Sequence, residues 1–194
     1  HCARQRVTFL ATPFDEESSE HLDPWTTAFK ISSYEMTHIP LVRHLAAKGK
    51  PLIISTGTAS IDEVGRTVDE CHAAGNGALA LLQCTAAYPA PFDSLNVRAL
   101  VTLAGRFRVP VGLSDHSRDP VVAPIAAVAC GASIIEKHFT LSNDLPGPDH
   151  RFALEPMELQ LMVKKIRQTE QVLGSGEKSV APVEEELRTF ARRS

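Results

Sequence analysis

Two histidines stand at the ends of apolar runs and could share one ligand. His116 follows the run Val109–Leu113, and His138 closes the run Ala132–His138, 22 residues further along the chain. An apolar, helix-like stretch separates the two runs, so the pattern predicts parallel strands joined by a crossover helix. In α/β barrels the carboxyl ends of the strands are where chemistry is assembled. Two neutral imidazoles there can bind one divalent metal; the alternative is that each histidine is a hydrogen-bonded structural residue.

Polar side chains also follow the other apolar runs. Hydroxyl groups and one lysine, gathered on the same rim, would make a site for a phosphate or a carboxylate. A metal held beside them could polarise a carbonyl group, which describes an enzyme that joins a phosphorylated acid to a carbonyl compound. The residues in question are Thr12, Lys30, Ser33, Glu35, Ser55, Tyr88, Ser114 and Asp149.

Several of these residues have a second interpretation. Lys30 lies within an apolar run, and a buried lysine needs a partner, which favours an anion-binding role. Glu35 can be a surface-loop carboxylate or a general acid and base. Ser55 can cap the turn to the next helix, and Asp149, in a Pro-Gly-Pro-Asp turn, can simply form that turn.

Six apolar segments must position these side chains. The strands that they form are expected to end at Thr12, Lys30, Ser55, Cys84, Asp115 and His138. These ends are 18 to 31 residues apart, which fits repeated βα units better than hairpins. A complete eight-unit barrel takes roughly 250 residues, so this length supplies about six units. We expect either an open, doubly wound sheet of six strands or an α/β barrel of the TIM type with two units missing. The segments are Val7–Ala11, Ala28–Ser32, Pro51–Thr56, Ala78–Thr85, Val109–Leu113 and Ala132–His138.

Helix signals separate these segments. Ser60 and Glu63 form a capping box, and Gly75 is a suitable C-terminal stop for the helix that they begin. Pro40 fits a first helical turn, with Gly49 ending that helix.

Two further helices are expected later in the chain. Asp93 or Ser94 can cap a helix that runs to about Gly105, and a last helix runs from near Pro156 to Gly174. Residues 1–174 would then form the barrel domain, and residues 175–194 a polar linker or extension. The apolar face of the last helix would comprise Leu159, Met162, Val163, Ile166, Val172 and Leu173.

Composition narrows the function classes. The chain has 194 residues and a net charge of −3, which gives no electrostatic reason to expect nucleic-acid binding. Its longest apolar stretch, Val121–Ile135, contains a proline and a glycine and is too short to span a bilayer. The amino terminus has no signal-peptide pattern, and the four cysteines are far apart without CxxC spacing, which favours reduced thiols in the cytoplasm.

The polar residues and their flanking motifs, taken in order, resemble the sialic acid (N-acetylneuraminate) synthase family. Each motif is short, but the ordered set covers nearly the whole chain and is specific. The matching motifs are Phe9–Phe14, Ala28–Ser33, Gly49–Pro51, Ser55–Gly57, Cys84–Pro89, Gly112–His116, Glu136–Thr140, Pro146–His150, Leu154–Pro156 and Gly174–Lys178.

The resemblance implies a TIM barrel that condenses phosphoenolpyruvate with N-acetylmannosamine, or a related N-acetylated hexosamine, and releases phosphate. It implies a divalent metal, Mn²⁺, held by His116 and His138. Glu35 would be the catalytic carboxylate, with Tyr88 and Asp149 facing the sugar. The residues implied for phosphoenolpyruvate are Thr12, Lys30, Ser33, Ser55 and Ser114.

The resemblance also implies parts that this sequence does not contain. Family members begin with two further βα units, which bring a glutamate and a lysine to the site, and continue into an antifreeze-like domain that reaches the partner subunit. This chain therefore matches strands three to eight of the barrel, and we expect little or no synthase activity from it alone. The full-length parent would be a homodimer.

Other functions remain open at this stage. Legionaminic, pseudaminic and spore-coat polysaccharide synthases share much of the pattern, and the sugar-facing residues do not separate them. A metal-dependent aldolase also uses histidines on barrel strands. A non-catalytic, ligand-binding fragment of a synthase is the third possibility.

Overall fold

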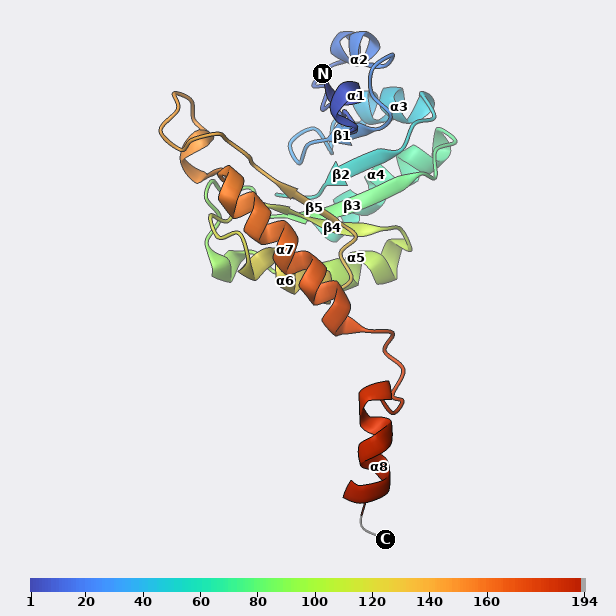
Figure 1. Cartoon of the computed structure of the whole chain (residues 1–194). Helices are drawn as coiled ribbons and strands as arrows, with labels where there is room; N and C mark the ends of the chain where they lie inside the picture. The colour runs from blue at the N-terminus through green and yellow to red at the C-terminus, as the bar shows by residue number, and fades with distance from the viewer. Residues whose placement is uncertain (193–194) are drawn as a thin grey trace.

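A five-stranded parallel sheet forms the centre of the molecule (Figure 1). The computed structural model describes residues 1–192. The strands lie side by side in the order in which they occur in the chain, and every neighbouring pair is parallel. They are β1 (Phe29–Ile31), β2 (Leu52–Ser55), β3 (Leu79–Cys84), β4 (Val111–Asp115) and β5 (Ile134–Lys137).

Helices connect the strands and cover the sheet. Because the strand order never reverses and such crossovers are right-handed, the connecting helices all fall on one face. A doubly wound sheet would reverse its order at a switch point, so the arrangement is that of a barrel wall. The connecting helices are α3 (Ile39–Ala47), α4 (Ile61–Ala73), α5 (Ala99–Phe107) and α6 (Val122–Ala129), and α7 (Pro156–Leu173) follows β5 and packs on α6.

Short helices occupy the remaining segments. The carboxyl-terminal helix α8, within the expected extension from residue 175, projects away from the sheet and its helices (Figure 1). The short helices are α1 (Cys2–Gln5), α2 (Glu16–Leu22), η1 (Phe92–Ser94), η2 (His150–Phe152), η3 (Pro182–Glu184) and α8 (Glu185–Ala191).

The strand expected at Val7–Ala11 is absent from the described residues, which corrects the count of six units. Only Ala11 pairs with the sheet, through one isolated parallel bridge to Phe29. Val7, Phe9 and Leu10 stay exposed because no neighbouring backbone or helix covers them.

The expected helix boundaries are mostly confirmed. The Ser60 hydroxyl accepts a hydrogen bond from the Glu63 amide, and the Glu63 carboxylate accepts one from the Ser60 amide at 2.7 Å. Pro40 lies in the first turn of α3. Gly75 and Gly174 have φ values of +82° and +62° just beyond α4 and α7, a conformation that side chains with a Cβ rarely adopt.

The helix expected from Asp93 or Ser94 was placed too early. Residues 92–94 form the single turn η1, and α5 begins only at Ala99. Asn96, between them, has a φ of +43°, which is incompatible with a continuous right-handed helix.

The two faces of the sheet differ in character. Phe29, Ile31, Leu52 and Ile54 are fully buried on the face that α3 and α4 cover. The alternate residues, including Lys30, point to the opposite face, since successive side chains of a strand alternate. Toward the strand ends this second face becomes polar, because Ser55, Ser114 and Glu136 lie on it with Lys30.

The apolar face expected for α7 is only partly covered. Met162 is buried and Leu159 and Ile166 are half-buried, while Val163, Val172 and Leu173 remain exposed. The contact with α6 therefore uses the middle of the helix and leaves its last turn free.

The close packing around Gly112 predicts that a larger residue there would destabilise the protein. A Cβ at this position would collide with the Ile134 carbonyl oxygen and lie 2.6 Å from Leu82 Cδ2. Gly112→Ala is therefore expected to lower the free energy of unfolding by about 1–3 kcal/mol, because the β4–β5 backbone would have to move. Urea denaturation measures the change.

The matched control for this variant is Gly105→Ala. A Cβ at Gly105 meets nothing within 4 Å, and the residue lies inside α5. That substitution is expected to stabilise the protein by about 0.5–1 kcal/mol. Equal unfolding midpoints for the two variants would contradict the close packing at Gly112.

Candidate active site

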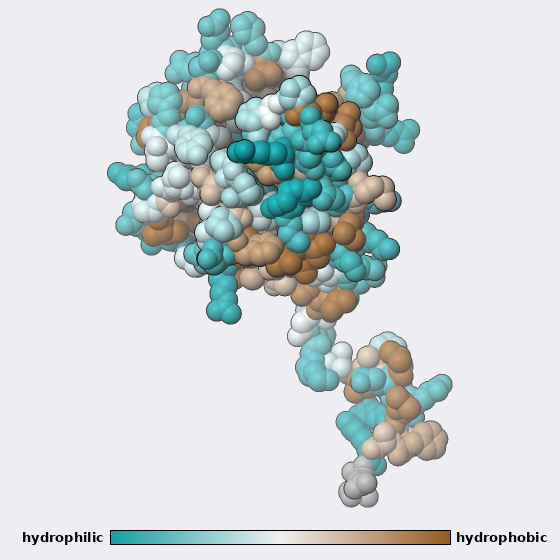
Figure 2. Space-filling model, turned by 90° about the vertical axis from the view of Figure 1, so that its left-hand side faces the viewer, coloured by the Kyte–Doolittle hydropathy of each residue, from teal (hydrophilic) through white to brown (hydrophobic). Residues whose placement is uncertain are grey.

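A cavity of about 310 Å³ opens at the carboxyl ends of the strands. Figure 2 views the molecule from the side on which the loop after β5 lies, where hydrophilic residues gather between hydrophobic ones. Eight of the ten site residues expected from the sequence line this cavity. They are Thr12, Lys30, Ser33, Ser55, Tyr88, Ser114, His116 and His138.

Strand alternation explains why these side chains meet. Ser114 pairs with Glu136 in the register of β4 and β5, and the two histidines lie two residues further along each strand. Residues i and i+2 of a strand share a face, so all four point into the same cavity.

Lys30 is held at the base of this group. Its side chain is only 10% exposed, and Nζ donates to Ser55 Oγ at 2.7 Å and to the Ile31 carbonyl at 3.0 Å. Glu136 Oε2 lies 3.6 Å from Nζ. Burial lowers the pKa of Lys30, and the Glu136 carboxylate opposes that shift. The ammonium group thus faces the cavity beside one paired carboxylate, a suitable arrangement for an anionic ligand.

Glu136 also lines the cavity, although it was not predicted as a site residue and stood only within the motif Glu136–Thr140. Its position two residues before His138 puts both side chains on the same face, so the alternation rule alone would have identified it.

His116 has a defined orientation. Nδ1 lies 2.8 Å from the Thr85 carbonyl oxygen, which can only accept a hydrogen bond, so this nitrogen carries the proton. Nε2 is then left with its lone pair. The ring is buried, and Tyr88 packs against it with ring centroids 4.2 Å apart. Burial raises the pKa of the Tyr88 phenol to about 12, so the hydroxyl is neutral.

His138 stands next to His116. The two ring centroids are 5.4 Å apart, and Phe152 packs on His138 at 5.1 Å. Burial, followed by the neighbouring His116, lowers the pKa of His138. A neutral imidazole is the form that binds a metal.

The donor set fits an open metal site. Within residues 1–192 no cluster of three or more His, Cys, Asp or Glu side chains could hold a metal. His116 and His138 could supply two ligands, one fewer than the three protein ligands of a typical catalytic zinc site, so water or substrate oxygens would have to complete the coordination.

Glu35 and Asp149 lie beside the cavity rather than in its wall. Glu35 accepts a hydrogen bond from the Ser32 hydroxyl. Asp149 Oδ2 is 3.7 Å from His138 Nδ1, and its side chain is largely exposed. Ser33 lines the cavity, but its hydroxyl already accepts a hydrogen bond from the Gly57 amide at 2.9 Å.

None of the helices among the described residues has the length and apolar character needed to cross a membrane.

Comparison with known proteins identifies close relatives. A model of the NeuB family matches residues 1–178. The chain is 43% identical over 97% of its length to N,N'-diacetyllegionaminic acid synthase of Legionella pneumophila, covering 54% of that protein. It is 42% identical over its whole length to the spore coat polysaccharide biosynthesis protein SpsE of Bacillus subtilis, covering 56% of that protein. The chain thus spans about half the length of these relatives.

Solved structures agree with the fold. The N-acetylneuraminic acid synthetase of Leptospira borgpetersenii, 33% identical, superposes with a TM-score of 0.91 over 97% of this chain and 66% of that one. A truncated 3-deoxy-D-arabino-heptulosonate 7-phosphate synthase from Thermotoga maritima, 15% identical, gives a TM-score of 0.78 over 89% of this chain and 69% of that one. The second likeness supports a TIM-barrel type of fold and nothing more specific.

Proposed function

The chain belongs to the NeuB family, and from this premise we propose that it carries the synthase site of a nonulosonate-forming enzyme. The proposed reaction condenses phosphoenolpyruvate with N-acetylmannosamine or a related N-acetylated hexosamine and releases phosphate. The observation that carries the proposal is the convergence of Lys30, His116 and His138 on one cavity. The synthase names of the relatives do not favour the aldolase alternative.

Lys30 and the hydroxyl groups around it would bind phosphoenolpyruvate. The ammonium group offsets the charge of the phosphate or carboxylate, and its bond to Ser55 keeps it directed at the cavity. Thr12, Ser33 and Ser114 would donate further hydrogen bonds to the anion. Glu136, close to Lys30, limits how much negative charge the base of the site accepts.

His116 and His138 would hold the divalent metal, for which we propose Mn²⁺. When bound, such an ion would polarise the aldehyde oxygen of the open-chain sugar. The Thr85 carbonyl keeps Nδ1 of His116 protonated, which leaves Nε2 as the donor atom.

The bond changes follow from the two substrates. The C2–C3 π electrons of phosphoenolpyruvate form the new bond from C3 to the aldehyde carbon, and the aldehyde oxygen takes up a proton. Water then adds at the electron-deficient C2 and loses a proton, and the tetrahedral intermediate breaks its C2–O bond to release phosphate. Glu35 is the carboxylate that we propose for proton transfer, and Tyr88 and Asp149 would face the sugar.

The reaction class can be tested directly. The native protein that carries this chain is incubated with Mn²⁺, phosphoenolpyruvate and one N-acetylated hexosamine at a time, and released phosphate and product are both quantified. We expect phosphate and a nine-carbon product to form in equal amounts. Removing Mn²⁺ with a chelator should abolish the formation of both. If the protein forms product when pyruvate replaces phosphoenolpyruvate, without phosphate release, it is an aldolase. If it binds the ligands but forms no product, it is a non-catalytic protein.

The same assay would identify the sugar. Relatives named for legionaminic, pseudaminic and N-acetylneuraminic acid are all similar to this chain. The hexosamine with the highest kcat/KM among those tested identifies the natural sugar substrate and therefore the product. Because the chain spans about half the length of its relatives, we expect little turnover from the 194-residue chain assayed alone.

A further inference from the structure

A buried ion pair lies on the far side of the two strands that carry the histidines. Asp115 and Lys137 are register partners in β4 and β5, and each immediately precedes a histidine. Their side chains are 0% and 3% exposed, and Lys137 Nζ lies 2.6 Å from Asp115 Oδ2. Alternation along the strands directs these two side chains away from Ser114 and Glu136, while Lys137 still borders the cavity.

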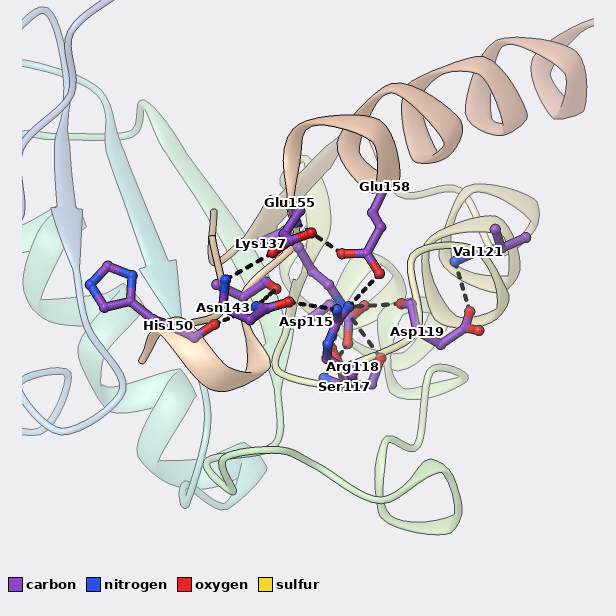
Figure 3. A network of polar contacts seen from close by, with 11 residues as sticks. Asp115, Ser117, Arg118, Asp119, Val121, Lys137, Asn143, His150, Glu155 and Glu158 are labelled. Carbon is purple, nitrogen blue, oxygen red and sulfur yellow. Dashed lines mark hydrogen bonds and ion pairs between the residues drawn. The ribbon is translucent and has the colours of Figure 1, made fainter. Parts of the chain in front are cut away.

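Lys137 also holds the loop that follows β4 (Figure 3). Its ammonium group donates to the Ser117 carbonyl, reaches the Ser117 hydroxyl at 3.3 Å and donates to the Asp119 carbonyl at 3.1 Å. The other oxygen of Asp115 accepts from the Ser117 amide at 2.8 Å. One side chain of β5 therefore fixes the backbone on which His116 lies.

Arg118 extends this connection to the loop after β5. Its guanidinium donates to Asn143 Oδ1 at 3.0 Å and pairs with Glu158 at 2.8 Å. The Asn143 side-chain amide in turn donates to the carbonyls of His150 and Ala153. This second loop carries Asp149 beside His138.

We propose that Lys137 is a positioning residue, which sets the separation and orientation of His116 and His138 by cross-linking the two strand ends. This proposal rests on the function proposed above, in which His116 and His138 are the metal ligands. Stability alone does not explain the pair, because a buried ion pair is often replaceable by apolar residues without loss. Lys137 instead has four oxygen acceptors, three of them in the loop 117–119.

Two variants test the proposal. Lys137→Met leaves the Asp115 carboxylate buried and unpaired, which can prevent folding. The double variant Asp115→Asn with Lys137→Met removes both charges, while the side-chain carbonyl of the introduced asparagine can still accept from the Ser117 amide. Lys165→Met, at an exposed position of α7, is the matched control.

Three measurements are made on each folded variant: the urea midpoint, the Mn²⁺ dissociation constant from the electron paramagnetic resonance of free Mn²⁺, and amide hydrogen exchange. In the double variant Mn²⁺ binding is expected to weaken about 10–100-fold, the range for ligand-orienting partners. Exchange is expected to rise in residues 115–121 and 138–150 but not in β1 and β2. The control should match the wild type.

Unchanged Mn²⁺ affinity and exchange in the double variant would overturn the proposal. Exchange raised equally throughout the sheet would also overturn it, since that indicates a purely structural role. A wild-type protein that binds no Mn²⁺ would refute the proposed function instead, and the exchange data would then decide the positioning role separately.

Discussion

Replacing His116 or His138 with alanine is expected to abolish measurable Mn²⁺ binding and to lower kcat/KM about 10²–10³-fold. In the proposed site each substitution removes one of the two imidazole ligands, which lie with ring centroids 5.4 Å apart, and we expect the remaining imidazole to be too weak a ligand set on its own. A Lewis acid contributes several kcal/mol of charge stabilisation, and each 1.36 kcal/mol is tenfold in rate.

Mn²⁺ titration and steady-state kinetics measure these two losses. His72→Ala is the control, since His72 is an exposed residue in the last turn of α4. It should leave both quantities within about twofold of the wild type. A His116→Ala or His138→Ala protein that binds Mn²⁺ normally would show that the metal lies elsewhere.

Lys30→Met is expected to lower kcat/KM for phosphoenolpyruvate by about 10²–10³-fold, the typical loss when one preorganised electrostatic donor is removed. The methionine has a similar length but no charge to offset the phosphate. The substitution also leaves Ser55 Oγ without its 2.7 Å partner and Glu136 without its counter-charge. Repulsion between Glu136 and the anionic substrate would therefore add to the loss.

Two control measurements test whether the loss in Lys30→Met comes from weaker binding of the anionic substrate. Mn²⁺ affinity in the absence of phosphoenolpyruvate should stay close to the wild-type value, because Lys30 is not a metal ligand in this proposal. Lys165→Met should match the wild type in both measurements. Normal phosphoenolpyruvate kinetics in Lys30→Met would mean that Lys30 serves only to satisfy buried polar groups around Ser55.

Strand positions, and the side chains that meet at one cavity, could largely be predicted from the sequence. Five of the expected strand ends, at Lys30, Ser55, Cys84, Asp115 and His138, lie within one residue of the ends in the structure. Apolar runs of a few residues with polar ends are typical of parallel strands that are covered by helices. Because the carboxyl ends of such strands meet at one edge, correct strands also led to a correct grouping of the side chains.

Three features could not be predicted in this way, each because it depends on tertiary contacts. Val7–Ala11 has the composition of a strand, but a strand needs a neighbouring backbone to bond along its length, and only Ala11 has one. The late start of α5 follows from the left-handed conformation of Asn96. The Asp115–Lys137 pair follows from strand register, which spacing along one chain does not reveal.

The exposed apolar residues of α7 are another feature that depends on tertiary contacts and could not be predicted from the sequence. Periodicity correctly predicted a helix between Pro156 and Gly174. It could not say how far the neighbour α6 extends along it, and Val172 and Leu173 lie beyond that contact.

In the proposed site, His116 and His138 would together hold one divalent ion beside an anion held by Lys30. Anomalous diffraction from crystals grown with Mn²⁺ and phosphoenolpyruvate tests it most directly. We expect one manganese peak within bonding distance of Nε2 of both histidines, with the phosphate or carboxylate of the ligand in contact with Lys30 Nζ. A manganese peak bound by neither or only one of these imidazoles, or a ligand bound away from Lys30, would contradict the claim.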